Sequence, residues 1–203
     1  MADAGNFAIK IDPASLASVH IMLDGIKNGA PRVLSRAINK TLDGVRTDSV
    51  NEIAKDITPT KTVIRNTFTV KKTNTANLKG YTASKGEPLG LIHYQARQTK
   101  KGVSVKVKRQ GTRAVILGAF IAKAKNATNV FWRQYRGPKK KTIPGFPYGI
   151  LPRPYRFPIQ RLTGPRVPDI MGNPKIIGII LNLAGIRLDK NLANQIDFEL
   201  SKL

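Results

Sequence analysis

The chain has 203 residues, and its 35 Lys and Arg against 12 Asp and Glu give a formal net charge of +23. Because 41% of the residues are hydrophobic, the composition excludes a disordered basic tail and predicts a packed core. The absence of cysteine excludes disulfides, thiolate zinc sites and cysteine nucleophiles. We expect a soluble, very basic protein of a reducing compartment, with neither a signal peptide nor a membrane span.

The first 60 residues predict a short strand followed by two helices. Phe7, Ile9 and Ile11 alternate with small or polar residues, as in a strand. A helix is predicted between the start signal Asp12-Pro13 and the end signal Asn28-Gly29. Its apolar stripe consists of Leu16, Val19, Leu23 and Ile26. A longer helix is predicted over residues 31–55, and we expect the two helices to form a hairpin that covers a sheet.

From residue 61 onward the apolar residues mostly follow a period of two, which is typical of strands. Thr60 is expected to cap a single helical turn over residues 61–66. Strands are predicted at 67–71, 89–93, 103–107, 115–121 and 130–135, with a turn over 123–129. The strand at 103–107 is the clearest, since its valines alternate with Ser104 and Lys106. Because the polar positions are so often Lys or Arg, we expect an antiparallel sheet with a basic exposed face.

Residues 138–174 hold 9 of the 13 prolines, which removes backbone donors and favours an extended arm over a helix or a central strand. Four aromatic residues of this arm are predicted to contact a neighbouring subunit: Phe146, Tyr148, Tyr155 and Phe157. After Pro174 a helical pattern resumes, and its last turns form an amphipathic stripe: Leu192, Ile196, Leu200 and Leu203.

These elements predict an α+β fold, in which an N-terminal helical hairpin packs on an antiparallel β-sheet and a proline-rich arm precedes C-terminal helices. We expect a single domain over residues 1–203. Its parts are a helical part (1–60), a basic β part (61–136), the proline-rich arm (137–174) and a C-terminal helical part (175–203).

The positive charge is concentrated in the middle of the chain. Residues 61–166 hold 24 Lys and Arg and a single acid, Glu87, whereas residues 1–60 and 167–203 are each neutral. So many like charges in a folded segment repel one another unless a partner neutralises them. A merely solvated face is one interpretation. We favour a surface for nucleic-acid phosphate, with an acidic protein partner as the second choice.

Patterns typical of catalysis or metal binding are missing from the sequence. His20 and His93 are far apart, and no glycine-rich phosphate loop, HExxH or GxSxG motif occurs. A two-metal nuclease would need clustered carboxylates, which the basic segment lacks. Four aromatic residues lie among apolar strand residues and are expected in the core rather than on a base-stacking surface: Phe68, Phe120, Phe131 and Trp132. We predict a protein that is not an enzyme and takes no cofactor or metal.

Five short segments match a known pattern when taken together. They are AINKTLDGVRT at 37–47, GVSVKV at 102–107, GAFI at 118–121, VFWR at 130–133 and PIQRLTGPRVP at 158–168. In this order they resemble the minor tail protein Z family of tailed phages and prophages, whose members are tail completion proteins. The similarity extends over residues 30–203, and PIQRLTGPRVP is its most specific segment.

The resemblance implies a structural virion protein of the tail, at the head-proximal end, that is assembled in the host cytoplasm. Its partners would be the tail terminator, neck or connector proteins and genomic double-stranded DNA, with no membrane involved. Such proteins typically form homo-oligomeric rings, most often hexameric. A ring lined by residues 61–166 would surround the DNA with cations, whose phosphate contacts do not depend on base sequence.

We predict that eight cations contact the DNA backbone, on the basis of charge placement alone. They are Lys71, Lys72, Lys106, Lys108, Arg109, Lys139, Lys140 and Lys141. The alternative hypothesis is a non-specific nucleic-acid-binding module of the ribosome- or nucleoid-associated type, and a nuclease is a remote third.

Overall fold

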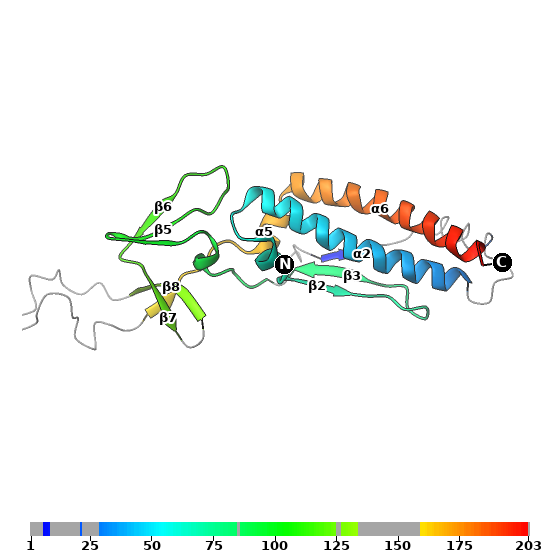
Figure 1. Cartoon of the computed structure of the whole chain (residues 1–203), viewed down its shortest axis with the longest axis horizontal. Helices are drawn as coiled ribbons and strands as arrows, with labels where there is room; N and C mark the ends of the chain where they lie inside the picture. Colours follow the sequence, from blue (N-terminus) through cyan, green and yellow to red (C-terminus); the bar gives the residue numbers. More distant parts are fainter. Residues whose placement is uncertain are drawn as a thin grey trace, which may run out of the picture. The chain divides into compact units, whose positions relative to one another are not determined.

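The computed structural model describes residues 6–8, 21, 29–84, 86–124, 127–133 and 159–202. Its helices and antiparallel strands confirm the predicted α+β class (Figure 1). The chain forms two compact units. Unit 1 consists of Met1–Lys55, Thr60–Glu87 and Arg166–Leu203, and unit 2 of Asp56–Pro59 and Pro88–Pro165. The units do not follow the four consecutive parts of the predicted domain, because unit 1 combines both ends of the chain with the first third of the basic β part.

The described residues of unit 1 form mainly two long helices and one small sheet. Its elements are β1 (Asn6–Ala8), α2 (Gly29–Asp56, whose last residue belongs to unit 2), α3 (Lys61–Arg65), β2 (Phe68–Lys71), β3 (Tyr81–Ser84), α5 (Val167–Met171) and α6 (Pro174–Leu200). α2 confirms the predicted long helix, and α3 confirms the single turn, where Val63 N donates to the N-cap Thr60 Oγ1 at 3.5 Å. The predicted helix over 13–28, and hence the helical hairpin, lies outside the described residues apart from Ile21.

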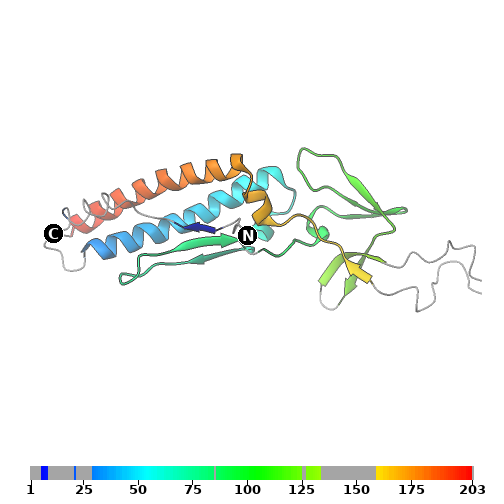
Figure 2. The ribbon, with the colours of Figure 1, turned by 180° about the vertical axis from the view of Figure 1, so that it is seen from behind.

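α2 is the central layer of unit 1, with α6 on one side and the sheet on the other (Figure 1 and Figure 2). The sheet is antiparallel, with the strand order β1-β3-β2. Asn39 Nδ2 on α2 donates to Thr73 O at 3.0 Å, and Thr82 Oγ1 on β3 donates to Leu42 O at 3.4 Å. A helix covered on two sides buries more than a single stripe, which explains why fourteen residues of α2 are buried.

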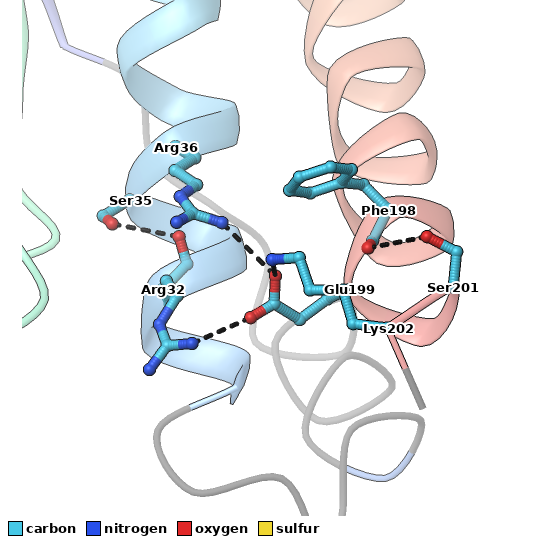
Figure 3. A network of polar contacts seen from close by, with 7 residues as sticks. All are labelled: Arg32, Ser35, Arg36, Phe198, Glu199, Ser201 and Lys202. Carbon is cyan, nitrogen blue, oxygen red and sulfur yellow. Dashed lines mark hydrogen bonds and ion pairs between the residues drawn. The ribbon is translucent and has the colours of Figure 1, made fainter.

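The carboxylate of Glu199 joins the end of α6 to the beginning of α2 (Figure 3). Its oxygens accept from Arg32 Nη1 at 2.9 Å, Arg36 Nη1 at 3.3 Å and Lys202 Nζ at 2.8 Å. Hydrogen bonds from Lys202 and then Arg32 hold the pKa of Glu199 below its ordinary value, although burial of the carboxyl acts in the opposite direction. Glu199 is therefore ionised at neutral pH, and its charge is neutralised where α6 ends.

Two further contacts fix α6 in an antiparallel register along α2. Asn191 Nδ2 donates to Thr41 Oγ1 at 2.9 Å, and both residues are buried. Arg187 donates to both carboxylate oxygens of Asp48, at 2.6 and 2.8 Å. The charged pair has a bidentate geometry, which sets orientation as well as distance. These contacts show that α6 is a partner of α2 in unit 1.

The described residues of unit 2 form two small antiparallel sheets and one short 3₁₀ helix. Its elements are η1 (Leu91–His93), β4 (Arg97–Thr99), β5 (Gly102–Val105), β6 (Ala114–Leu117), β7 (Phe120–Ala124), β8 (Ala127–Arg133) and β9 (Ile159–Arg161). The strand orders are β4-β5-β6 and β7-β8-β9, so the described strands form three sheets instead of the single sheet that the sequence predicts. The core between them contains Leu91, Tyr94, Val103, Val105 and Val130.

The predicted strand over residues 89–93 is wrong, because η1 occupies its second half. Leu91 and Tyr94 are both buried, and their spacing of three residues suits a helical turn. The turn is held by a neighbouring segment that is distant in sequence. Leu91 N donates to Leu162 O at 3.1 Å, and Gly164 N donates to Leu89 O at 2.7 Å. Tertiary contacts therefore decide the local conformation here.

Two more predictions need correction. The strand predicted over 115–121 is divided into β6 and β7 at Gly118, whose φ of 74° favours glycine. Within the proline-rich region, residues 138–158 lie outside the described part of the chain. The end of that region does form a helix, α5, with Pro168 in its first turn, where proline is tolerated. β9 is an edge strand, which suits its proline-rich surroundings.

Candidate nucleic-acid interface

Unit 2 holds most of the excess positive charge of the chain. It contains 17 Lys and Arg against a single acid, Asp56, which gives a formal charge of +16. Unit 1 contains 18 Lys and Arg against 11 Asp and Glu, which gives +7. The predicted basic segment, residues 61–166, is therefore divided between the two units. Its acid-free part, residues 88–165, belongs entirely to unit 2.

The described cations of unit 2 face solvent without acidic partners. They are Arg97, Lys100, Lys101, Lys106, Lys108, Arg109, Arg113, Lys123, Arg133 and Arg161. All of them are exposed except Lys106, which is half-buried. Every ion pair found among the described residues joins two residues of unit 1. A bound polyanion would therefore relieve the mutual repulsion of these cations.

One cation of the β4-β5-β6 sheet, Arg97, lies on its outer face, and the other cations lie at strand ends and in turns. The cross-strand rows of that face are Arg97–Ser104–Val115 and Thr99–Gly102–Leu117. The predicted basic exposed face therefore applies only in part to this sheet, because Val115 and Leu117 share that face with Arg97. Lys100 and Lys101 form the turn between β4 and β5, while the cations at 106, 108 and 109 follow the end of β5.

Two guanidinium groups of unit 2 are held in place by oxygen atoms of the same unit. Arg113 donates from Nε to Ser104 Oγ at 2.9 Å, and from Nη2 to Ser104 O at 3.1 Å and Gln95 O at 2.5 Å. Arg109 donates from Nε to Ile57 O at 3.1 Å. These contacts restrict the conformations of the two side chains, so a phosphate bound there would cost less conformational entropy.

Aromatic rings and cations share the outer face of the β7-β8-β9 sheet. The rings of Phe120 and Phe131 are half-buried, with centroids 6.2 Å apart, and they are absent from the core cluster. The guanidinium of Arg133 lies 4.8 Å from the centroid of Phe120, and Arg161 is the cross-strand neighbour of Phe131. The predicted core position is confirmed for Phe68, which is buried in unit 1, but it is wrong for Phe120 and Phe131.

Trp132 is half-buried and packs against the core of unit 2, as predicted. Its indole Nε1 donates to Gln160 Oε1 on the neighbouring strand at 3.1 Å. Trp132 and Val130 therefore form the core side of β8, and the alternate residues 131 and 133 form the outer side. This alternation places the Phe131 ring and the Arg133 guanidinium on the same outer side of the sheet.

The predicted DNA contacts are divided between the two units. Lys106, Lys108 and Arg109 belong to unit 2 and lie close together in sequence, directly after β5. Lys71 and Lys72 belong to unit 1. There, Lys72 Nζ lies 2.9 Å from Asp43 Oδ2, and Lys71 Nζ lies 5.8 Å from the centroid of Tyr81. Lys72 therefore already has a counter-charge, which weakens the case for a phosphate contact.

The other predicted site residues lie outside the described residues. They are the cations Lys139, Lys140 and Lys141 and the aromatic residues Phe146, Tyr148, Tyr155 and Phe157. Sequence reasoning also missed seven cations of unit 2: Arg97, Lys100, Lys101, Arg113, Lys123, Arg133 and Arg161. The signal that could have found them is the absence of Asp and Glu over residues 88–165.

His93 adds no positive charge to this surface at neutral pH. Partial burial, followed by the charge of Arg161, lowers the pKa of His93 below its ordinary value. In the described part of the chain, no group of three or more His, Asp and Glu is placed to hold a metal ion. No helix among the described residues has the length and apolar character needed to span a membrane.

Comparisons of this chain with protein-family models, with curated proteins and with solved structures found no match.

Proposed function

We propose that this chain is a structural protein that completes the tail of a phage or prophage at the head-proximal end. In this proposal it forms a homo-oligomeric ring that joins tail to head, and the cations of unit 2 line the passage for double-stranded DNA. The proposal rests on the resemblance of five segments to the minor tail protein Z family and on one physical observation. That observation is the acid-free stretch 88–165, which gives unit 2 a formal charge of +16.

The charge distribution supports contact with a phosphate backbone rather than recognition of a base sequence. The exposed cations are spread over strand ends and turns, and α2 is not a basic helix that could enter a major groove. Lys and Arg contacts to phosphate release counterions and are indifferent to sequence. Such contacts suit a channel through which an entire genome passes.

A titration with duplex DNA tests the phosphate contacts. We expect binding that weakens steeply with salt and does not differ between unrelated sequences. Replacing three exposed lysines of unit 2, Lys100→Ala, Lys101→Ala and Lys108→Ala, should reduce the slope of log K against log salt by about 0.9 per lost contact. The matched control replaces three exposed lysines of unit 1: Lys61→Ala, Lys79→Ala and Lys190→Ala. Equal losses in both variants would contradict a role for unit 2.

Location in the particle separates this proposal from the alternative, a free non-specific nucleic-acid-binding module. Electron cryo-microscopy of virions, with an antibody fragment against this chain as a label, should show the label at the junction of head and tail. A chain that is absent from virions and binds cellular nucleic acid would favour the alternative. Metal-dependent cleavage of DNA would contradict both.

A further inference from the structure

The N-terminal half of α6 is apolar, yet several of its large side chains are exposed. Residues 176–186 include no charged residue, and Asn182 is their only polar side chain. Of these residues only Ile180 is buried. The exposed fractions are 36% for Ile177, 46% for Ile179, 56% for Leu181 and 59% for Ile186. A helix that is apolar on all sides is normally enclosed by other protein, and the described residues of the chain do not supply all of this cover.

The exposed apolar side chains form two separate flanks of the helix. At about 100° per residue, Ile177 and Leu181 lie together on one flank, and Ile179 and Ile186 lie together about 140–180° away on the other. The buried Ile180, between the two flanks, is part of the face that packs within unit 1. The two flanks therefore point in different directions, and one partner helix cannot cover both.

Two glycines allow a close approach beside the first flank. A Cβ atom added at Gly178 or Gly185 would meet no other atom within 4 Å. On the helical wheel both glycines lie next to Leu181, on the side away from Ile180. Their missing side chains leave room for a neighbouring helix or sheet to reach the backbone of α6.

Charge indicates which kind of partner covers the flanks. Two copies of a chain with a formal charge of +23 repel each other over most of their surfaces. Residues 176–186 are uncharged, and the C-terminal segment 167–203 is neutral overall. Two copies can therefore meet here and bury apolar area without bringing unpaired cations together. An acidic partner would instead be attracted to unit 2.

We propose that α6 is the contact between copies of this chain, with the Ile177–Leu181 flank of one copy packed against the Ile179–Ile186 flank of the next. Contact between two different surfaces is heterologous, and it closes into a ring when the rotation between copies allows. This inference rests on the ring in the proposed function, and it names the surface that builds the ring. It requires no nucleic acid.

Two charge variants test this arrangement, because each removes one flank and leaves the other intact. Sedimentation velocity of the full chain should show oligomers larger than a dimer for the wild type and monomers for Leu181→Asp and for Ile179→Asp. A mixture of the two variants should form heterodimers and nothing larger, since only one competent contact can form. Ala193→Asp, at an exposed position beyond the apolar segment, is the matched control and should assemble like the wild type.

A mixture that stays monomeric would overturn the proposal, because the two intact flanks would then not bind each other. Homodimers formed by one variant alone would mean pairing of identical flanks and would overturn it as well. Disulfide trapping provides a second measurement that does not depend on charge. The chain has no cysteine, so Leu181→Cys mixed with Ile179→Cys should form a disulfide between copies, and neither variant alone should. Abundant disulfide dimers from one variant alone would also overturn it.

DNA binding by the monomeric Leu181→Asp variant separates this inference from the proposed function. We expect the variant to keep the salt-dependent affinity of a single unit 2, because the substitution lies in unit 1. A wild-type chain that binds duplex DNA but remains monomeric would overturn the α6 contact alone. A chain that assembles through α6 but does not bind DNA would leave this contact standing and contradict the DNA channel.

Discussion

Tyr94 lies in the core of unit 2 with its side chain fully buried. Its hydroxyl donates to Pro165 O at 2.9 Å, and a Cβ atom on Gly164 would lie 2.4 Å from the Tyr94 ring. The phenol therefore fixes the segment after β9 to the core by one polar and one steric contact. Burial raises the pKa of Tyr94 to about 12, because the phenolate would lose its hydration.

The raised pKa predicts a loss of stability at alkaline pH. The neutral phenol is favoured in the folded state, so its contribution is complete below the ordinary pKa of 10.0 and is lost as the pH rises towards about 12. Tyr94→Phe should remove this pH dependence and, at pH 8, lower the free energy of unfolding by about 0.5–1.5 kcal/mol through the lost hydrogen bond. Urea unfolding at a series of pH values measures both effects.

The exposed Tyr81 supplies the control for this experiment. Tyr81→Phe removes an exposed hydroxyl in unit 1 and leaves Tyr94 in place, so the alkaline transition attributed to Tyr94 should remain. If Tyr94→Phe and the wild type lose stability in parallel above pH 10, the alkaline transition arises from other groups and the buried phenol is not its cause.

At the level of elements, a buried hydrogen bond between two uncharged side chains contributes to the pairing of α2 with α6. Thr41 Oγ1 donates to Ala37 O at 2.8 Å and accepts from Asn191 Nδ2 at 2.9 Å. Thr41→Val should leave the buried amide of Asn191 without its acceptor, which costs about 1–3 kcal/mol in the free energy of unfolding. Chemical denaturation of the single and double variants measures this cost.

A double-mutant cycle separates the hydrogen bond from the packing. Adding Asn191→Leu to Thr41→Val replaces both polar groups by apolar groups, and we expect the double variant to recover most of the stability lost by Thr41→Val alone. Additive losses would mean that the two residues do not interact, and the α2–α6 register would then rest on the ion pairs at Asp48 and Glu199.

Elements with strong local signals could be predicted from the sequence. The stripe of α2, the cap at Thr60 and the alternating valines of β5 all depend on neighbouring residues, and the structure contains each of them. The 3₁₀ turn at 91–93 could not be predicted, because hydrogen bonds to residues 162–164 impose it. The partner of α2 could not be predicted either, since Glu199 and Asn191 are distant in sequence and look like ordinary surface residues.

The candidate site was only partly predictable, for a reason that concerns the whole molecule. Counting charges along the chain identifies the basic segment, but Lys71 and Lys72 fold into unit 1 while Lys106 and Lys108 fold into unit 2. Pairing of Lys72 with Asp43 also depends on tertiary structure. Phe131 lies on an outer sheet face because of the register of β8 with its two neighbouring strands. The apolar residues around Phe131 in the sequence do not indicate this register.

At the scale of the whole molecule, the separation of charge predicts that the two units respond differently to salt. Unit 2 has a formal charge of +16 and no ion pair among its described residues, so screening should stabilise it. Raising the salt from about 0.01 M to about 1 M shortens the Debye length from about 30 Å to about 3 Å. Hydrogen exchange should slow more for amides of β5 and β8 than for amides of α2, whose ion pairs are weakened by the same salt.

A charge-reversal variant tests whether repulsion within unit 2 is the cause of this response. Lys100→Glu with Lys101→Glu lowers the formal charge of unit 2 from +16 to +12 in an exposed turn. We expect slower exchange of β5 and β8 amides at low salt and a smaller further effect of added salt. Lys61→Glu with Lys190→Glu makes the same change in unit 1 and should leave the exchange of unit 2 unaltered. A wild-type unit 2 that responds to salt no more than unit 1 would mean that its cations are too far apart to repel, and the need for a polyanion would lose its physical basis.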